Sequence, residues 1–138
     1  MLRCHDLPSD FHPLLLIVGE RTDIPALAAV CSRFAENGIP VTLSELSCVV
    51  HSTGPITISR CADHDRSGVV RAVETGAGLI WRMDKPTALR YADELKALLD
   101  ADLLSGSCFL ELGYIDEIRV KVTFGEFDDS WLTGEKRV

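Results

Sequence analysis

The stretch that decides the fold is LLLIVGERTDIPALAAVCSRFAENGIP, residues 14–40. It opens with an uninterrupted apolar run, Leu14 to Val18, and Gly19 follows this run. Such a run is typical of a strand covered on both faces, because a solvated face would require alternating polar residues. The sequence therefore predicts a strand here, in the middle of its sheet.

The rest of the same stretch predicts a helix between Asp23 and Gly38. Asp23 offers an N-cap oxygen just before Pro25, a residue favoured in the first turn. Gly38 can adopt the left-handed conformation that closes a helix, and Pro40 prevents its continuation. Apolar residues recur between these ends with the spacing of one helix face: Ile24, Leu27, Ala28, Cys31, Phe34 and Ala35.

The following stretch predicts two hairpins. Val41 to Val50 alternates but changes phase near Ser44-Glu45, which indicates a strand with a bulge. Turn residues at 52–55 then lead to Ile56 and Ile58, which we expect on the paired strand. A second hairpin is predicted from Val69–Val73 and Leu79–Met83.

A second helix and two strands complete the predicted elements. Asp84 caps the helix, which stops near Gly106. Its apolar stripe consists of Ala88, Tyr91, Ala92, Leu95, Leu98 and Leu99. Residues 108–112 and 118–124 then alternate as strands do.

This order of elements predicts an α+β fold for a single domain over residues 1–138. We expect a mainly antiparallel sheet with both amphipathic helices packed on one face, because several strands follow one another without a helix between them. A ferredoxin-like core with an added hairpin is the favoured topology. Residues 1–10 and 133–138 are expected to be loosely ordered ends.

Charge and composition exclude several classes of function. The 14 Lys and Arg against 21 Asp and Glu give a net charge of −7, so nucleic acid is not expected as a partner. The longest apolar run is too short to cross a membrane, and the first residues do not resemble a signal peptide. Five cysteines without a compact pattern favour reduced thiols, and hence the cytoplasm.

Two Cys-x-x-His pairs form a candidate metal site, Cys48 with His51 and Cys61 with His64. Thiolate and imidazole are ligands that zinc prefers. Neither register of the predicted 41–58 hairpin brings all four together, so cysteines in the core beside exposed histidines are the favoured interpretation. His64 between Asp63 and Asp65 has the charges of an oriented general base, but no nucleophile is placed beside it, so a solvated turn is favoured.

The strand-to-helix turn is a candidate ligand site, with Arg21, Thr22 and Asp23 as its residues. Free N–H groups at a helix N-terminus can bind an anion. The carboxylates of Glu20 and Asp23 oppose this, and a plain N-cap role for Asp23 is the favoured alternative.

A third candidate is the C-terminal segment FGEFDDSWL, residues 124–132. Aromatic anchors beside acidic side chains are typical of a surface that binds a basic protein. The candidate partner-binding residues are Glu126, Phe127, Asp128, Asp129 and Trp131. Alternatively, the two aromatic side chains fold back over the core.

The sequence as a whole predicts a small acidic binding protein without catalytic residues or cofactor. A protein partner or self-association, for instance as a homodimer, is expected, and one form of this is an antagonist of a basic protein. A regulatory domain that binds a small molecule at the strand–helix junction, residues 19–25, is the first alternative. A metalloprotein or hydrolase that uses the Cys and His residues at 48–64 is the second.

Overall fold

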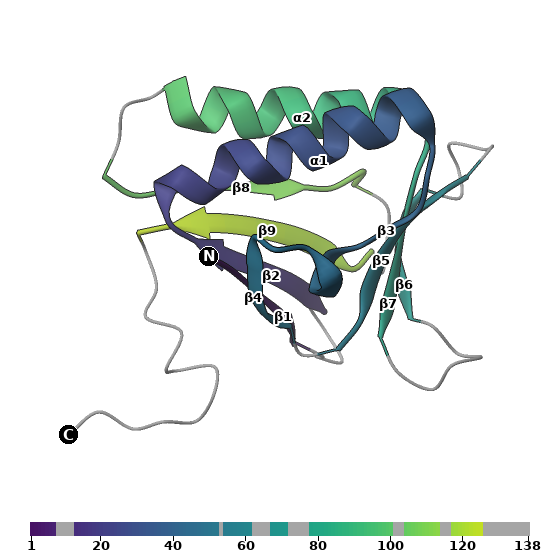
Figure 1. Ribbon diagram of the computed structural model, residues 1–138, viewed down its shortest axis with the longest axis horizontal. Helices are drawn as coiled ribbons and strands as arrows, with labels where there is room; N and C mark the ends of the chain where they lie inside the picture. The colour runs from purple at the N-terminus through teal and green to yellow at the C-terminus, as the bar shows by residue number, and fades with distance from the viewer. Residues whose placement is uncertain are drawn as a thin grey trace.

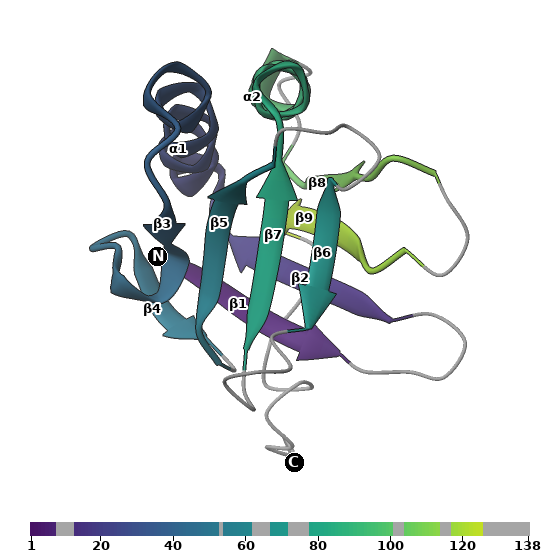
Figure 2. The same cartoon turned by 90° about the vertical axis from the view of Figure 1, so that its right-hand side faces the viewer.

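The computed structural model describes residues 1–7, 13–52, 54–61, 67–71, 78–100, 104–113 and 117–125. These residues form two mixed β-sheets and two α-helices, α1 (Ile24–Asn37) and α2 (Lys85–Asp100). The helices lie side by side along one side of the molecule (Figure 1). The four-stranded sheet crosses the strands β1 and β2 of the five-stranded sheet (Figure 2). The α+β class and the two predicted helices are therefore confirmed.

The five-stranded sheet has the spatial order β4-β1-β2-β9-β8. Its strands are β4 (Val49–Ser52), β1 (Leu2–Leu7), β2 (Leu14–Gly19), β9 (Arg119–Phe124) and β8 (Gly106–Leu110). The β1–β2 and β8–β9 pairs are antiparallel, whereas β2–β9 and β1–β4 are parallel. β1 has no counterpart among the predicted elements.

The four-stranded sheet has the order β3-β5-β7-β6. Its strands are β3 (Val41–Thr42), β5 (Ile56–Arg60), β7 (Leu79–Met83) and β6 (Gly68–Arg71). The predicted β6–β7 hairpin pairing is confirmed, but β5 and β7 are parallel. The prediction of one mainly antiparallel sheet was wrong, because parallel pairs join distant segments in both sheets. The described residues show no ferredoxin-like core.

β2 is the central strand of its sheet, as the apolar run 14–18 predicts, and it is buried on both faces. Leu15 and Ile17 lie on the face that packs against the helices and the four-stranded sheet, which we call the inner face. Leu16 and Val18 lie on the opposite, outer face, because successive side chains alternate across a strand.

The C-terminal end of α1 is as predicted from the sequence, but its N-terminal cap is not. Gly38 closes the helix in the left-handed conformation, with φ of 63°, and its N–H donates to the Phe34 carbonyl at 2.8 Å. Asp23 does not cap α1 with its side chain, which corrects the prediction. Its carboxylate instead accepts the Glu20 N–H at 2.8 Å and fastens the 3₁₀ turn η1 (Arg21–Asp23). In α2 the Asp84 carboxylate accepts the Thr87 N–H at 2.8 Å, as predicted.

The phase change near Ser44-Glu45 marks a crossing between the two sheets. β3 pairs antiparallel with β5, as the predicted hairpin requires, but the chain then forms the 3₁₀ turn η2 (Leu43–Glu45). β4 follows and pairs in parallel with β1 in the other sheet. The prediction of one bulged strand over Val41–Val50 was wrong, because the apolar side chain of Leu43 turns into the core, where it is 1% exposed.

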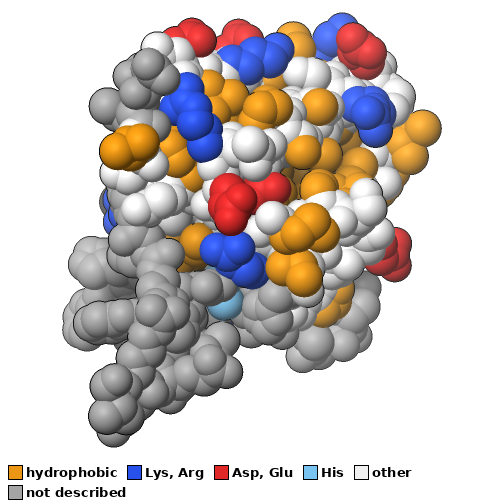
Figure 3. All heavy atoms as spheres, turned by 60° about the vertical axis from the view of Figure 1, so that its left-hand side comes forward, with side chains coloured by type: hydrophobic (Ala, Val, Ile, Leu, Met, Phe, Trp, Pro, Cys, Tyr) orange, Lys and Arg blue, Asp and Glu red, His pale blue; other side chains and the backbone are white. Residues whose placement is uncertain are grey.

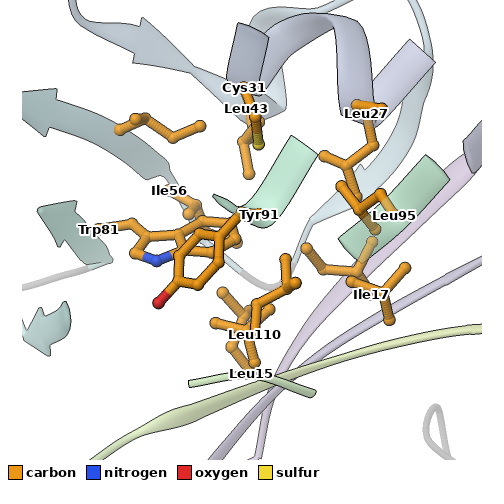
Figure 4. Close-up of a cluster of buried hydrophobic side chains, with 14 of the residues drawn as sticks. Leu15, Ile17, Leu27, Cys31, Leu43, Ile56, Trp81, Tyr91, Leu95 and Leu110 are labelled. Carbon is orange, nitrogen blue, oxygen red and sulfur yellow. The ribbon is translucent and has the colours of Figure 1, made fainter. Parts of the chain in front are cut away.

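The buried apolar side chains of both helices and both sheets form one cluster. Trp81 of β7 and Tyr91 of α2 meet there with ring centroids 5.8 Å apart, as Figure 4 shows. Trp81 and Tyr91 are each 1% exposed, so both rings are part of the core.

Candidate functional site

Two surfaces of the described chain have features of a binding site, and the first is a hollow between α1 and α2. Its volume is about 430 Å³. Small side chains on α1 leave space there, and longer ones from both helices surround it: Pro25, Ala28, Ala29, Ser32, Arg33, Glu36, Lys96 and Leu99. The hollow can accept an apolar side chain, and Arg33, Glu36 and Lys96 can make polar contacts around it.

The second surface is the outer face of the five-stranded sheet. Across β1, β2, β9 and β8 it presents the row His5, Leu16, Lys121, Phe109 and the row Arg3, Val18, Thr123, Ser107. Arg119 lies on the same face as Lys121, because the two residues are two apart along β9.

Cations surround an aromatic ring on this outer face. The Arg119 guanidinium lies 4.7 Å and the Lys121 ammonium 5.7 Å from the centre of the Phe109 ring, which is 38% exposed. Arg119 also forms an ion pair with Glu111 at 3.8 Å. The outer face therefore combines positive charge with apolar and aromatic side chains.

The middle of the outer face is buried. Leu16 is 4%, Val18 1%, His5 4% and Thr123 0% exposed. Leu16 and Val18 are nevertheless outside the core cluster that holds the other buried apolar residues. Neither described helix packs on this face (Figures 1 and 2).

The predicted ligand residues Arg21, Thr22 and Asp23 form η1, directly after β2. The Arg21 guanidinium donates to the Leu99 carbonyl at the end of α2 and lies 5.8 Å from the Phe124 ring. Thr22 is exposed. Two of the three predicted side chains thus hold the fold together, and anion binding at this turn stays a prediction.

Asp23 has a lowered pKa. Burial alone would raise it, but the hydrogen bond from the Glu20 N–H, the N-terminal ammonium at 2.9 Å and the charge of Arg3 outweigh this effect. The carboxylate is therefore ionised at neutral pH and stabilises the turn that leaves β2.

Cys48 and Cys61, one cysteine from each predicted Cys-x-x-His pair, lie beside different sheets. Cys48 accepts the Leu2 N–H through its carbonyl beside β1, whereas Cys61 follows β5 and its sulfur lies 3.2 Å from the Ser67 hydroxyl. The His51 side chain and all of His64 are outside the described residues. Among the side chains that are described, no three His, Cys, Asp or Glu residues group as metal ligands do. A metal site formed by all four residues, which the sequence disfavours, is an alternative that the described residues do not test.

All five cysteines are free, and burial makes three of them poor nucleophiles. Desolvation raises the pKa of Cys4 and of Cys31 to about 12, and Cys48 adds to the effect at Cys4. Burial and the nearby charge of Glu94 raise the pKa of Cys108 to about 11. These three thiols remain protonated at neutral pH, which agrees with the role of core residues.

The candidate partner residues Glu126, Phe127, Asp128, Asp129 and Trp131 lie outside the described residues, as do the chain end 133–138 and the Asp63 and Asp65 carboxylates. The charges of the described residues show how much of the net charge lies in these segments. The described residues contain 11 acidic and 11 basic side chains, so the net charge of −7 lies in the other segments. On the face in Figure 3, acidic and basic side chains are interspersed with apolar ones.

The outer face was not among the surfaces predicted from the sequence. Its signal was present in the run Leu14–Val18, because a strand apolar on both faces needs a second covering layer. The strand β1, which was not predicted, supplies Arg3 and His5 to this face. It lies in a segment that was expected to be loosely ordered.

Comparison of this chain with protein-family models, curated proteins and solved structures gives no match. Neither helix in the described part of the chain has the length and apolar character needed to cross a lipid bilayer.

Proposed function

We propose that this chain is a small acidic binding protein that recognises a basic protein partner and has no catalytic role. The observation that carries the proposal is the separation of charge. The described scaffold is neutral, and the whole acidic surplus lies in the connecting segments and in the C-terminal segment 126–138. Acidic side chains around an aromatic anchor attract a basic surface and then bind it.

The segment from Glu126 to Trp131 is the centre of the proposed partner site. It contains three carboxylates and two aromatic side chains and lacks Lys and Arg. The free cysteines support the further proposal that the protein works in a reducing compartment such as the cytoplasm. Antagonism of the basic partner is part of the same proposal, because a surface that binds a basic site also masks it.

Affinity capture with matched charge variants tests this function. The immobilised chain of residues 1–138 is compared with a triple variant, Glu126→Gln, Asp128→Asn and Asp129→Asn. The control carries Glu45→Gln, Asp93→Asn and Asp100→Asn, which removes the same charge from exposed residues of the scaffold.

We expect a basic protein to bind the native chain and the control but not the C-terminal variant. Its association rate should fall roughly tenfold or more between low and physiological salt, because steering by charge is screened. Equal capture by both variants, or a rate independent of salt, would contradict the proposal.

A further inference from the structure

The solvent side of the helix pair combines a hollow with an exposed leucine. The hollow between α1 and α2 has a volume of about 430 Å³, and Ala28, Ala29 and Leu99 give it an apolar lining. Leu89 of α2 is 42% exposed. It lies on the same side of α2 as Lys96 at the rim of the hollow, because residues seven apart are about two turns apart on a helix. The face therefore presents an apolar side chain and, about 10 Å further along the same helix, an open space for one.

We propose that this face of the helix pair binds a second copy of the chain, with Leu89 of each copy in the hollow of the other. The two helices run in opposite directions side by side, so the hollow and Leu89 lie at different points along one groove (Figure 1). In a two-fold symmetric dimer the same patch of both copies is used, and every contact forms twice. A second copy therefore supplies both the side chain that the hollow can hold and the hollow that Leu89 can enter.

The charges around the hollow complement one another in the same reciprocal way. Glu36 of α1 and Lys96 of α2 both line the hollow and are exposed. Within the described part of the chain, neither side chain forms an ion pair. When the hollows of two copies face each other, Glu36 of one copy can contact Lys96 of the other, and symmetry forms this pair twice. Opposite charges at matching positions favour one register of two surfaces over others.

The size of the face indicates a weak, reversible dimer. The longer helix, α2, has 16 residues and is therefore about 24 Å long. Two helices about 10 Å apart form a face about 20 Å across, so each copy contributes about 480 Å². Both copies together bury about 1,000 Å², which is at the lower limit of specific interfaces, whereas stable complexes bury about 1,600 Å². We therefore expect a dimer that dissociates on dilution.

The dimer face and the proposed partner site share no residue. The partner site is centred on residues 126–131, whereas the dimer face consists of side chains from α1 and α2. A chain that dimerises can therefore fail to capture a basic protein, and a chain that captures one can be monomeric. The capture experiment and the experiment below test separate claims.

Sedimentation equilibrium of residues 1–138 tests the dimer over about a hundredfold range of protein concentration. We expect the native chain to change from monomer to dimer across this range. Leu89→Asp should weaken dimerisation about tenfold or more, because it removes the apolar side chain and places a charge in the hollow. The control is Leu104→Asp, which makes the same change at a leucine that is 99% exposed and lies outside both helices. It should leave the dissociation constant unchanged, and circular dichroism verifies that both variants are folded.

A charge swap tests the register of the two copies. Lys96→Glu and Glu36→Lys should each weaken the dimer about fivefold, because like charges then meet across the interface. The variant with both changes should return to within about twofold of the native dissociation constant, because the reciprocal pair forms again.

Several results would overturn the proposed dimer. The first is a native chain that stays monomeric at the highest concentration. The second is a dimer that Leu89→Asp leaves intact or that Leu104→Asp weakens equally, because such a dimer forms through another surface. The third is a charge-swapped double variant as weak as the single variants, which contradicts the contact between Glu36 and Lys96.

Discussion

The two faces of β2 are equally buried but by different means. Ile17, on the inner face, is 0% exposed and belongs to a cluster built from both helices and both sheets. Val18, on the outer face, is 1% exposed and lies outside this cluster. Burial by itself therefore does not distinguish side chains of the core cluster from those on the outer face of the same strand.

The largest loss of stability is expected for a substitution on the inner face of β2. Ile17→Ala should lower the free energy of unfolding by about 3–4 kcal/mol, because it removes buried methyl groups and leaves a cavity among residues that cannot collapse. Equilibrium denaturation with urea measures this loss. A loss below about 1 kcal/mol would contradict the packing described for the inner face.

A smaller loss is expected on the outer face. Leu16→Ala should cost about 2 kcal/mol, because Leu16 lies outside the cluster of helix and sheet side chains to which Ile17 belongs, so its surroundings can adjust more easily to the smaller side chain. The two variants should be measured under the same conditions. A loss of stability as large as that of Ile17→Ala would contradict the expected difference in packing between the two faces.

The stability of the turn at the end of β2 should depend on pH through the Asp23 carboxylate. Its pKa is lowered in the folded protein, so its contribution to stability is present above the ordinary carboxylate pKa of about 4 and is lost as the pH falls through the lowered value. Asp23→Asn should therefore lower stability by about 1 kcal/mol at pH 7, with a difference that shrinks toward pH 2. Thermal unfolding of both proteins over this range measures it, and a difference that is constant with pH would contradict the assignment.

The smallest effect concerns the ion pair that joins the inner face to the four-stranded sheet. The Arg71 guanidinium contacts the Asp6 carboxylate at 2.6 and 3.3 Å, with the Arg71 side chain 44% exposed. Asp6→Asn should cost only about 0.5 kcal/mol, and less at high salt, because solvent screens the pair. Chemical denaturation at two salt concentrations checks this, and a loss above about 2 kcal/mol would show that the contact matters more than its exposure implies.

Local patterns in the sequence were sufficient to predict both helices and the central strand. The apolar spacing from Ile24 and the glycine at Gly38 determine α1 without help from distant residues. The sheets were harder to predict, because pairing partners are set by tertiary contacts. The phase change at residues 43–45 was visible, but the transfer of the chain to the other sheet depends on Leu43 entering a core made by other elements.

The candidate sites were less predictable than the fold for a related reason. Arg21 and Asp23 were named by residue type as members of a ligand site, yet their partners, Leu99 and Glu20, are set by the folded chain. The basic outer face needs side chains from β1, β8 and β9 together, which no single stretch of sequence contains. The C-terminal segment 124–132 stands out by its composition alone, and its role as a partner site stays a prediction.

Two double-mutant cycles, which combine Leu95→Ala with Ile17→Ala or with Leu16→Ala, test the difference between the two faces of β2 most directly. Residues in contact give non-additive losses of stability, whereas distant residues give additive ones. We predict a coupling of about 1 kcal/mol for Ile17 with Leu95, which share the core cluster (Figure 4), and additive losses for Leu16 with Leu95. Additivity within about 0.3 kcal/mol in the Ile17 cycle, or an equal coupling in the Leu16 cycle, would contradict the difference between the two faces.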